Sequence, residues 1–230
     1  MKLRSRVAYA ILPKQVWDAL RQEWPMAKLR WNNTWSRRRI QKRFHNVHQL
    51  KIHLGCGKRV TPGWLNVDCF AAPGIDLVWD LRVPLPFADE CASFIYHEHV
   101  LEHVSKEDAG QLLQECHRVL ATDGVLRIGV PDAEIYVRAY MAGDRNFFKS
   151  LDHLGNTVEP LETPMEVINQ AFRMDGHHRF AWDWPTLQLA LTKAGFKSTC
   201  KFASGEASSK ELCLDDPSHA FETLYAEARK

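Results

Sequence analysis

The stretch that decides the fold is residues 51–68, KIHLGCGKRVTPGWLNVD. It predicts a strand ending at Leu54, a glycine turn over residues 55–57, a second strand over 64–67, and an acid, Asp68, where that strand ends. Glycine suits the turn because it adopts positive φ and lets the backbone approach a ligand closely. An acid at the carboxyl end of a parallel strand can accept both hydroxyls of a ribose. The stretch therefore favours a nucleoside-containing cofactor at the edge of a parallel sheet.

Two features of this stretch argue against a nicotinamide dinucleotide. The dinucleotide fingerprint is G-x-G-x-x-G, and Val60 stands at its third glycine position. Asp68 follows Gly57 by only 11 residues, whereas that fingerprint places its ribose acid about 20 residues on. The alternative without a ligand is a tight turn in an α/β sheet with a surface aspartate.

Size and composition indicate one domain with an extension. The chain has 230 residues, of which 45% are hydrophobic and 25% charged, as in ordinary globular proteins. Its six cysteines form no C-x-x-C pair, so neither a zinc ribbon nor a redox motif is supported, and we expect free thiols in a reducing cytosol. The early apolar run over 7–12 is too short for a signal peptide, which favours a cytoplasmic protein.

Positive charge is concentrated at the N-terminus. Residues 1–50 hold 12 Lys or Arg against two acids, and the remainder hold 18 against 26. Residues 1–48 are predicted to form a basic helical extension, with one or two short helices interrupted at Pro13 and with Trp24, Trp31 and Trp35 among the basic residues. This extension can pack its tryptophans on the main domain, lie on an anionic membrane or glycolipid, or bind nucleic acid, which is the least favoured partner.

The remaining residues, 49–230, read as alternating strands and helices. Beyond the opening stretch, strands are predicted over 75–81, 93–96, 125–130, 196–202 and 223–228. Helices are predicted over 106–120, 136–141, 164–174 and 184–194. Such alternation predicts a doubly wound α/β sheet. Residues from about 133 to 178 are less regular, and we interpret them as an insert that covers the active site.

Several motifs occur in an order that is similar to a known family. They are LGCG at 54–57, NVD at 66–68, WDL at 79–81, VLEHV at 100–104, HRVLATDGVLRIGVPD at 117–132, AGF at 194–196, GEASSKEL at 205–212 and FETLYAEARK at 221–230. Over residues 50–230 the chain resembles class I S-adenosylmethionine-dependent methyltransferases, in particular the methyltransferase-11-like group associated with cell-envelope sugar loci. The resemblance implies a Rossmann-like, seven-stranded sheet with helices on both faces and an antiparallel last strand.

The resemblance also implies how S-adenosylmethionine is bound, with S-adenosylhomocysteine as the product. The implied cofactor-binding residues are Gly55, Cys56, Gly57, Asp68, Asp80, Leu81, His97 and Glu98. The turn would cradle the amino-acid part, Asp68 the ribose, Asp80 and Leu81 the adenine, and His97 and Glu98 the methionine portion. One position departs from the pattern, because His53 stands where many relatives have an acid below the cofactor's ammonium group.

A histidine-rich stretch, 97–103, is the most unusual chemically. His99, Glu102 and His103 form H-x-x-E-H, which on a helix would place two histidines on one face. The pattern matches an inverted zinc-protease motif, but it lies where a methyltransferase helix is expected. It also resembles the metal-binding E-x-x-E-H of ubiquinone-biosynthetic O-methyltransferases, with His99 in place of the first acid. Three interpretations are open: Glu102 and His103 are structural, His99 is a general base or substrate contact, or the residues bind a metal. We assign His99 as catalytic and expect no metal.

His178 is the second candidate base, with a capping or loop histidine as its alternative. Asp132, Tyr136 and Arg138 are weaker candidates near the acceptor. The predicted reaction moves the sulfonium methyl to a hydroxyl of a sugar or surface glycan, free or lipid-linked, at the inner face of the membrane. The alternatives are a methyltransferase of nucleic acid or a small metabolite, and a binding protein without activity. The oligomeric state stays open.

Overall fold

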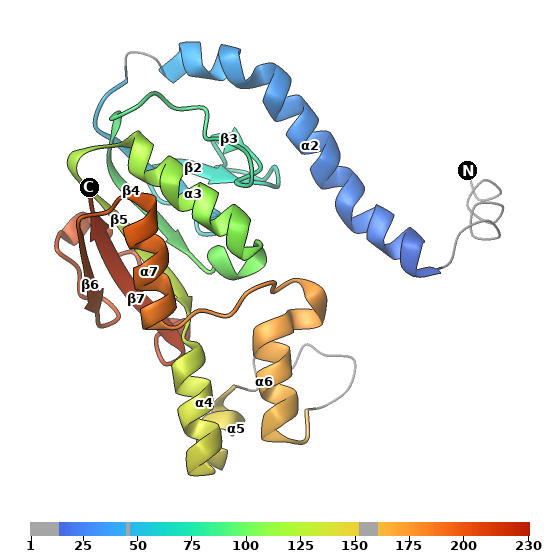
Figure 1. The fold of residues 1–230 in the computed structure, drawn as a ribbon. Coiled ribbons are helices and arrows are strands. Elements are labelled where there is room, and N and C mark those ends of the chain that lie inside the picture. Colours follow the sequence, from blue (N-terminus) through green and yellow to red (C-terminus); the bar gives the residue numbers. More distant parts are fainter. Residues whose placement is uncertain (1–13, 45–46, 152–160) are drawn as a thin grey trace.

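The computed structural model describes residues 14–44, 47–151 and 161–230. Its centre is a seven-stranded sheet in the order β3-β2-β1-β4-β5-β7-β6 (Figure 1). The strands are β1 (Leu50–Leu54), β2 (Leu65–Asp68), β3 (Leu77–Val78), β4 (Ala92–Glu98), β5 (Leu120–Pro131), β6 (Ser198–Phe202) and β7 (Thr223–Arg229). β1 to β5 pair in parallel, and β7 runs antiparallel to both β5 and β6. The predicted Rossmann-like sheet with its antiparallel last strand is confirmed.

The direction of winding reverses beside β1. The chain proceeds from β1 through β2 to β3 on one side, then returns to place β4 and β5 on the other. Ile52 in β1 pairs with Leu65 in β2 and with Ile95 in β4. Ligands of open α/β sheets bind where the strand order reverses, outside the carboxyl ends of the strands. The ends of β1, β2 and β4 therefore frame the candidate site.

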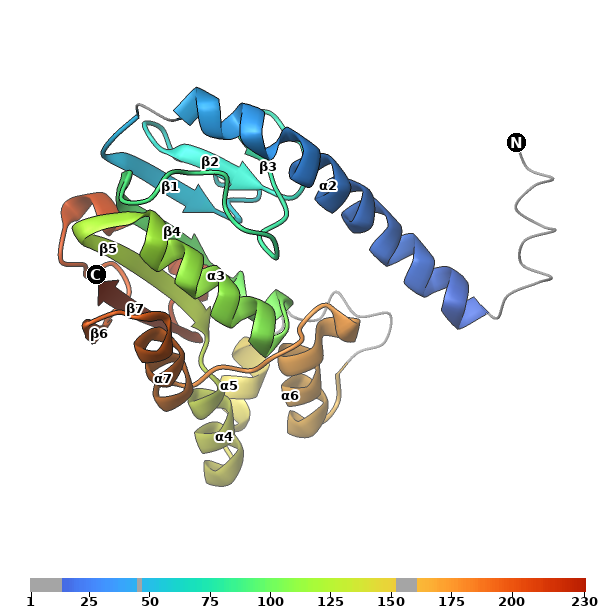
Figure 2. The same ribbon diagram turned by 45° about the horizontal axis from the view of Figure 1, so that its top comes forward.

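Two helices cover one face of the sheet (Figures 1 and 2). In α3 (Lys106–Val119), the Ser105 hydroxyl caps the first turn by accepting from the Asp108 N–H, and an apolar stripe faces the core. α7 (Trp184–Ala194) packs beside α3 and ends at Gly195, whose φ of +107° is a left-handed cap that favours glycine. Residues 203–214 and Trp64 cover part of the other face.

The residues between β5 and α7 form a small subdomain at the carboxyl end of β5 (Figure 2). It contains α4 (Ala133–Ala142), α5 (Arg145–Ser150) and α6 (Pro164–Arg173). Thr163 and Glu166 make the capping box that starts α6, as the Thr-Pro pair in the sequence predicts. A separate apolar cluster, which includes Tyr136 and Phe148, holds these helices together.

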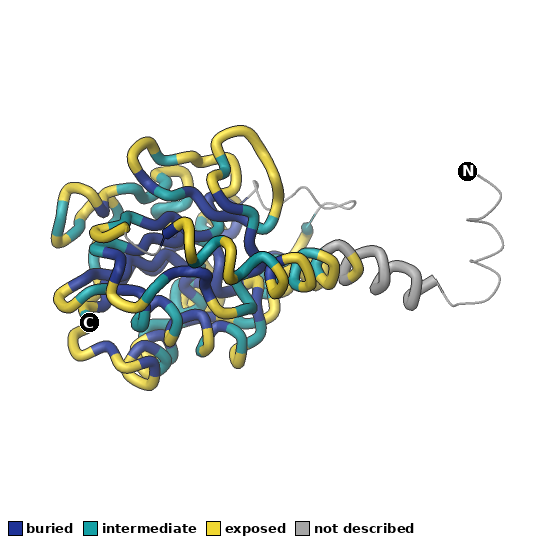
Figure 3. The backbone as a smooth tube through the Cα atoms, turned by 90° about the horizontal axis from the view of Figure 1, so that it is seen from above, coloured by how far each residue is buried: buried dark blue, intermediate teal, exposed yellow. Residues whose placement is uncertain are grey.

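The N-terminal extension contains one continuous helix, α2 (Lys14–Phe44), rather than the predicted one or two short helices. Pro13, the predicted interruption, lies outside the described residues. Phe44 is buried against the edge of the Phe87 ring, with 5.5 Å between centroids. The C-terminal half of α2 lies against the domain, and the helix runs outward from there (Figures 1 and 3).

Asn33 fixes α2 to the edge of the sheet. Its Nδ2 donates to the Val78 carbonyl at 3.2 Å, and its Oδ1 accepts from the Asp80 N–H at 2.8 Å. The tryptophans do not share this contact, because the exposed fractions of Trp24, Trp31 and Trp35 are 70%, 67% and 74%. Among the described residues, no helix combines the length and apolarity needed to cross a membrane.

Candidate active site

The glycine turn has the backbone shape that the sequence predicts. Gly55 and Gly57 have φ of +62° and +53°, in the left-handed region that favours glycine. A Cβ on Gly55 would lie 2.4 Å from Cγ2 of Val100, so the turn packs directly against the loop after β4. A Cβ on Gly57 would meet nothing within 4 Å. Gly55 is therefore required for packing, and Gly57 leaves room beside the turn.

Asp68 lies against the turn, as its position at the end of β2 predicts. Its Oδ2 accepts from the Gly57 N–H at 2.8 Å, and its Oδ1 accepts from the Phe70 N–H at 2.9 Å. The connection between the turn and β2 is fixed by Asn66, which accepts from the Thr61 N–H and donates to the Thr61 carbonyl. The carboxylate is thus oriented by backbone donors, with lone pairs left to accept further bonds.

The residues beneath the turn carry no charge near neutral pH. His53 is buried and its Nδ1 lies 3.0 Å from Oγ1 of Thr61. Burial, with a contribution from the charge of Arg59, lowers the pKa of His53 to about 4. Burial raises the pKa of the Cys56 thiol to about 11. His53 thus supplies a neutral ring where the related pattern has an acid.

His97 and Glu98 point to opposite faces of β4, as alternation along a strand requires. His97 is fully buried, and neither ring nitrogen has a hydrogen-bond partner among the described residues. Burial lowers the pKa of His97 to about 4. Glu98 shares its face with Tyr96, whose hydroxyl donates to it at 2.9 Å. Of the two predicted neighbours of the methionine portion, only Glu98 belongs to the polar network at the strand ends.

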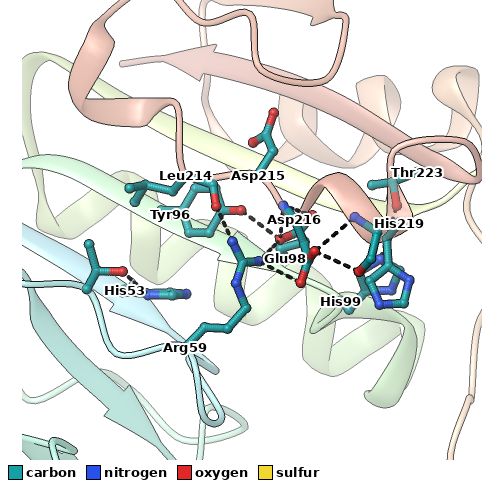
Figure 4. Close-up of polar contacts among 12 residues, drawn as sticks. His53, Arg59, Tyr96, Glu98, His99, Leu214, Asp215, Asp216, His219 and Thr223 are labelled. Atoms are coloured by element: carbon teal, nitrogen blue, oxygen red, sulfur yellow. Dashed lines mark hydrogen bonds and ion pairs between the residues drawn. The ribbon is translucent and has the colours of Figure 1, made fainter.

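Glu98 is the centre of that network (Figure 4). It also accepts from the Tyr225 hydroxyl at 2.6 Å, from the Asp216 N–H, and from Nη1 of Arg59 at 2.5 Å. Burial alone would raise the pKa of Glu98, but these donors and the Arg59 charge outweigh it and hold the pKa below its usual value. Glu98 is therefore a buried carboxylate that stays ionised.

Arg59 is a functional candidate that the sequence reasoning missed. Besides Glu98, its guanidinium donates to the Leu214 carbonyl at 2.5 Å and lies 3.6 Å from the Asp216 carboxylate. Leu214 is 155 residues away in sequence, so no local pattern reveals the contact. A cation two residues after Gly57 is the available signal.

A buried ion pair holds the chain segment that meets Arg59. Asp215 accepts from Arg127 on β5, with Nε to Oδ1 at 2.8 Å and Nη2 to Oδ2 at 2.5 Å. Arg127 is completely buried and also donates to Glu227 at 3.1 Å. A bidentate, fully satisfied pair of this kind fixes position well. It places Leu214 and Asp216 over the glycine turn.

Asp80 lies in an ion-pair network rather than at an open edge. The residue is 1% exposed. Its carboxylate accepts from Nε and Nη2 of Arg82 at 3.0 Å each and lies 3.3 Å from Nε of Arg30 in α2. Leu81 is half-buried and packs against the main core. The structure thus connects Asp80 to the extension, and its role toward adenine stays a prediction.

The H-x-x-E-H pattern is not one helix face, and that part of the prediction is wrong. β4 ends at Glu98, His99 has φ of +53°, and a 3₁₀ turn, η1 (Leu101–His103), follows. His99 is nevertheless held beside Glu102, with Nδ1 3.0 Å from Oε1. Its Nε2 lies 3.1 Å from Oγ1 of Thr223 on β7.

Acidic neighbours surround the His99 ring. Burial disfavours the charged imidazole, but Glu102, Glu98 and Glu222 outweigh it and raise the pKa of His99. Its ring also packs on His219, with 4.8 Å between centroids. Thr223 and His219 are further neighbours that the sequence reasoning missed, because they come from β7 and from the segment before it.

The second candidate base, His178, lies beside His103 and not beside His99. Its ring packs against His103, with centroids 4.7 Å apart, and its Nδ1 lies 2.6 Å from the Ala171 carbonyl oxygen.

The three weaker candidates near the acceptor lie in or beside α4. Asp132 caps α4 by accepting from the Glu134 N–H. Tyr136 is buried and donates to Glu222. Arg138, with Glu134, Val137 and Asp183, lines an open groove of about 350 Å³.

Comparison with known proteins gave one family match and several similar solved structures. Residues 76–128 match a family model described as a methyltransferase domain, and no curated protein matches the chain. A SAM-dependent methyltransferase from Archaeoglobus fulgidus is 16% identical over 88% of this chain and 96% of its own, with a TM-score of 0.47. The Burkholderia thailandensis 1,6-didemethyltoxoflavin-N1-methyltransferase, solved with S-adenosylhomocysteine, is 14% identical over 95% and 90%, with a TM-score of 0.47.

The family match and the observed sheet order together confirm the predicted enzyme, an S-adenosylmethionine-dependent methyltransferase, and its cofactor. The matched segment is one part of the chain, from the residue before β3 into β5. The description of the family model names no methyl acceptor.

Proposed function

We propose that the protein transfers the methyl group of S-adenosylmethionine to an acceptor hydroxyl, with the cofactor bound across the ends of β1, β2 and β4. The observation that carries the proposal is the contact between Gly57 and Asp68. Two backbone donors orient the carboxylate, and its remaining lone pairs suit the paired hydroxyls of a ribose.

The methionine portion of the cofactor would lie beside Arg59 and Glu98. An amino acid is a zwitterion, and these two side chains offer one charge of each sign. In this arrangement Glu98 attracts the ammonium group and the sulfonium, and Arg59 attracts the carboxylate. The neutral His53 beneath the turn adds no charge, so Glu98 takes the place of the acid expected there.

His99 is the proposed general base. The carboxylate of Glu102 holds Nδ1, which leaves Nε2 directed at a hydroxyl, that of Thr223. An acceptor hydroxyl that replaced Thr223 at Nε2 would give its proton to His99 while its oxygen attacks the methyl carbon. The carbon–sulfur bond of bound S-adenosylmethionine would break, and its electron pair would stay on sulfur as neutral S-adenosylhomocysteine. Positioned proton transfer of this kind contributes about 10²–10⁴-fold.

The acceptor class we propose is a sugar or glycan hydroxyl. The resemblance to the group of cell-envelope sugar loci supports it, as does the groove beside α4, whose Glu134, Arg138 and Asp183 offer polar contacts. A methyltransferase of nucleic acid or of a small metabolite is the alternative, and a salt-sensitive complex with RNA would favour the nucleic-acid form.

Methyl transfer from labelled S-adenosylmethionine to a panel of sugars, lipid-linked glycans, RNA and small metabolites tests this function. We expect transfer to a hydroxyl of a glycan, with turnover reduced at least about a hundredfold in His99→Ala. His48→Ala removes an exposed histidine far from this network and is the matched control. Less than about tenfold loss in His99→Ala would contradict the base, and transfer only to RNA or to a metabolite would contradict the acceptor class.

We also propose a cytoplasmic protein that binds an anionic membrane through α2. Trp31 and Trp35 follow Trp24 by 7 and 11 residues, which at about 100° per residue places all three on one side of the helix. Asn33 and Phe44, which contact the domain, lie on the opposite side. Tryptophan prefers the interface between lipid and water, and neighbouring basic residues attract anionic headgroups.

Sedimentation with vesicles tests this surface. Vesicles with anionic headgroups should bind the full chain, and neutral vesicles should not. Replacing Trp24, Trp31 and Trp35 with serine should abolish binding while S-adenosylhomocysteine affinity is unchanged. Equal binding to both kinds of vesicle would contradict membrane binding through α2, as would vesicle binding that is unchanged in the triple variant.

A further inference from the structure

Glu102, His103 and His178 form a cluster in which only Glu102, as the partner of His99, has a part in the proposed reaction. Each offers one ligand atom, and these three atoms lie within 4.8 Å of one another. Glu102 and His103 come from η1, and His178 follows η3 (Met174–Gly176). Two imidazoles and one carboxylate form a ligand set that binds zinc and related ions with coordination positions left open. We infer that Glu102, His103 and His178 bind a divalent transition-metal ion.

The two imidazoles are held in the form that ligates a metal. Nδ1 of His103 lies 3.2 Å from the His177 carbonyl oxygen, and Nδ1 of His178 lies 2.6 Å from that of Ala171. A carbonyl oxygen only accepts, so Nδ1 of each ring carries the hydrogen and Nε2 keeps its lone pair. Metal-binding histidines usually donate their other N–H to such a partner, which fixes the tautomer and the ring orientation.

The carboxylate of Glu102 is the second, independent observation. Its residue is 2% exposed, and neither oxygen accepts a hydrogen bond of ordinary geometry from the described residues. Its close partner is the His99 ring, whose Nδ1 lies 3.0 Å from Oε1. One imidazole is little compensation for a buried carboxylate, and a divalent cation would lower the cost of burying it further.

A cavity beside this carboxylate has the size of a single small ligand. It measures about 10 Å³, which is near the room that one water requires. Glu102 and His178 line it together with apolar side chains that include Phe180 and Trp182. Its polar wall is therefore formed by two of the three proposed ligands.

Backbone contacts keep the two ligand-bearing segments together. The Arg179 and Phe180 N–H groups both donate to the Glu102 carbonyl, at 2.7 and 3.3 Å. Tetrahedral ligands about 2.0–2.1 Å from a zinc ion lie roughly 3.3 Å apart, so atoms within 4.8 Å of one another need to converge by at most about 1.5 Å. Because the backbone hydrogen bonds already hold the two segments together, rotation of the side chains is enough to supply that movement.

The structure changes the ligand set considered from the sequence. H-x-x-E-H suggests His99, Glu102 and His103, but His99 contacts Glu102 directly and is absent from the cluster. His178 replaces it. Neutral imidazoles with one carboxylate suit Zn²⁺, Co²⁺ or Fe²⁺, whereas Mg²⁺ and Ca²⁺ prefer oxygen ligands.

Metal titration of the full chain after chelator treatment tests the inference. Calorimetry with Zn²⁺ should show one ion bound per chain, and Co²⁺ should give visible absorption bands in the same stoichiometry. His103→Ala and His178→Ala should each weaken Zn²⁺ binding at least about a hundredfold, since even outer partners of a metal site contribute about 10–100-fold. His177→Ala removes the neighbouring exposed imidazole and should change affinity less than about twofold.

Absence of Zn²⁺ and Co²⁺ binding in the wild-type chain would overturn the site, as would unchanged affinity in both alanine variants. Mg²⁺ binding as tight as Zn²⁺ binding would also contradict this ligand set. Circular dichroism checks folding, and His178→Gln, which keeps most of the side chain, replaces any alanine variant that unfolds. S-adenosylhomocysteine affinity is measured on the same samples. A chain that binds this compound but no Zn²⁺ contradicts the metal site alone, and the reverse result contradicts the cofactor site alone.

Discussion

The N–H of Gly57 donates a 2.8 Å hydrogen bond to Oδ2 of Asp68, so the glycine turn after β1 and the acid that ends β2 form one unit. Parallel pairing of β1 with β2 brings the two ends together, and positive φ at Gly57 turns the N–H toward the carboxylate. The shape of the turn and the orientation of the proposed ribose acceptor therefore depend on each other.

Asp68→Asn should weaken S-adenosylhomocysteine binding about tenfold or more. The substitution keeps the size of the side chain but removes the charge, and a charge-assisted hydrogen bond contributes roughly 1.5–3 kcal/mol. Isothermal titration calorimetry measures the effect. Asp89→Asn, at an exposed carboxylate that pairs with Arg118, is the control and should bind like the wild type. An unchanged affinity in Asp68→Asn would remove Asp68 from the cofactor site.

Gly55→Ala should destabilise the fold more than Gly57→Ala. Both positions have positive φ, which costs a non-glycine residue about 1–2 kcal/mol. Only a Cβ on Gly55 collides with Val100, at 2.4 Å, and overpacking adds about 1–3 kcal/mol. Urea denaturation measures both variants, and adding Val100→Ala to Gly55→Ala should shrink the difference between them. Equal destabilisation by the two alanines would contradict the close packing of the turn.

Arg127→Leu should lower the free energy of unfolding by about 3–5 kcal/mol, because Asp215 and Glu227 would remain buried without their cation. The segment that carries Leu214 and Asp216 should loosen as well, so S-adenosylhomocysteine affinity should fall in the same variant. Arg138→Leu breaks an exposed pair with Glu134 and should change stability by less than about 0.5 kcal/mol. Similar losses in the two leucine variants would show that the buried pair has no special role.

Acid should destabilise the fold in part through His53. Its pKa is about 4 in the folded chain and about 6.5 when unfolded, so the unfolded state binds more protons between these values. The stability from this group is fully present above pH of about 6.5 and is lost as the pH falls toward 4. At pH 5 the loss is about 2 kcal/mol.

Urea denaturation at pH 7.5 and pH 5 measures this contribution. His53→Asn should lose less stability between the two conditions than the wild type, and His48→Asn, at an exposed position, should lose as much. Arg59, Glu98 and Asp68 are the charged groups around His53 and stay in place in both variants. The same loss in wild type and His53→Asn would contradict a buried, neutral histidine.

Local signals in the sequence predicted the elements that depend on neighbouring residues. The glycine turn, the acid after β2 and the caps of α6 and α7 are each fixed by a few consecutive residues, and the structure has them where expected. The count of seven strands and the antiparallel last strand followed from the resemblance and not from the spacing of the strands.

Contacts between distant segments could not be predicted. Arg59 meets Leu214 across 155 residues, and His99 meets Thr223 across 124, so only the folded sheet brings them together. The H-x-x-E-H pattern was assigned to a helix because its spacing fits one. The positive φ of His99 ends the strand in a turn instead, and this directs His103 toward His178.

A crystal structure of the chain with saturating S-adenosylhomocysteine tests the central claim most directly. We predict that the compound lies beside the turn at residues 55–57, with both ribose hydroxyls within hydrogen-bond distance of the Asp68 carboxylate and the amino-acid part beside Arg59 and Glu98. A complex in which the compound lies away from that turn, or in which Asp68 contacts no part of it, would contradict the account.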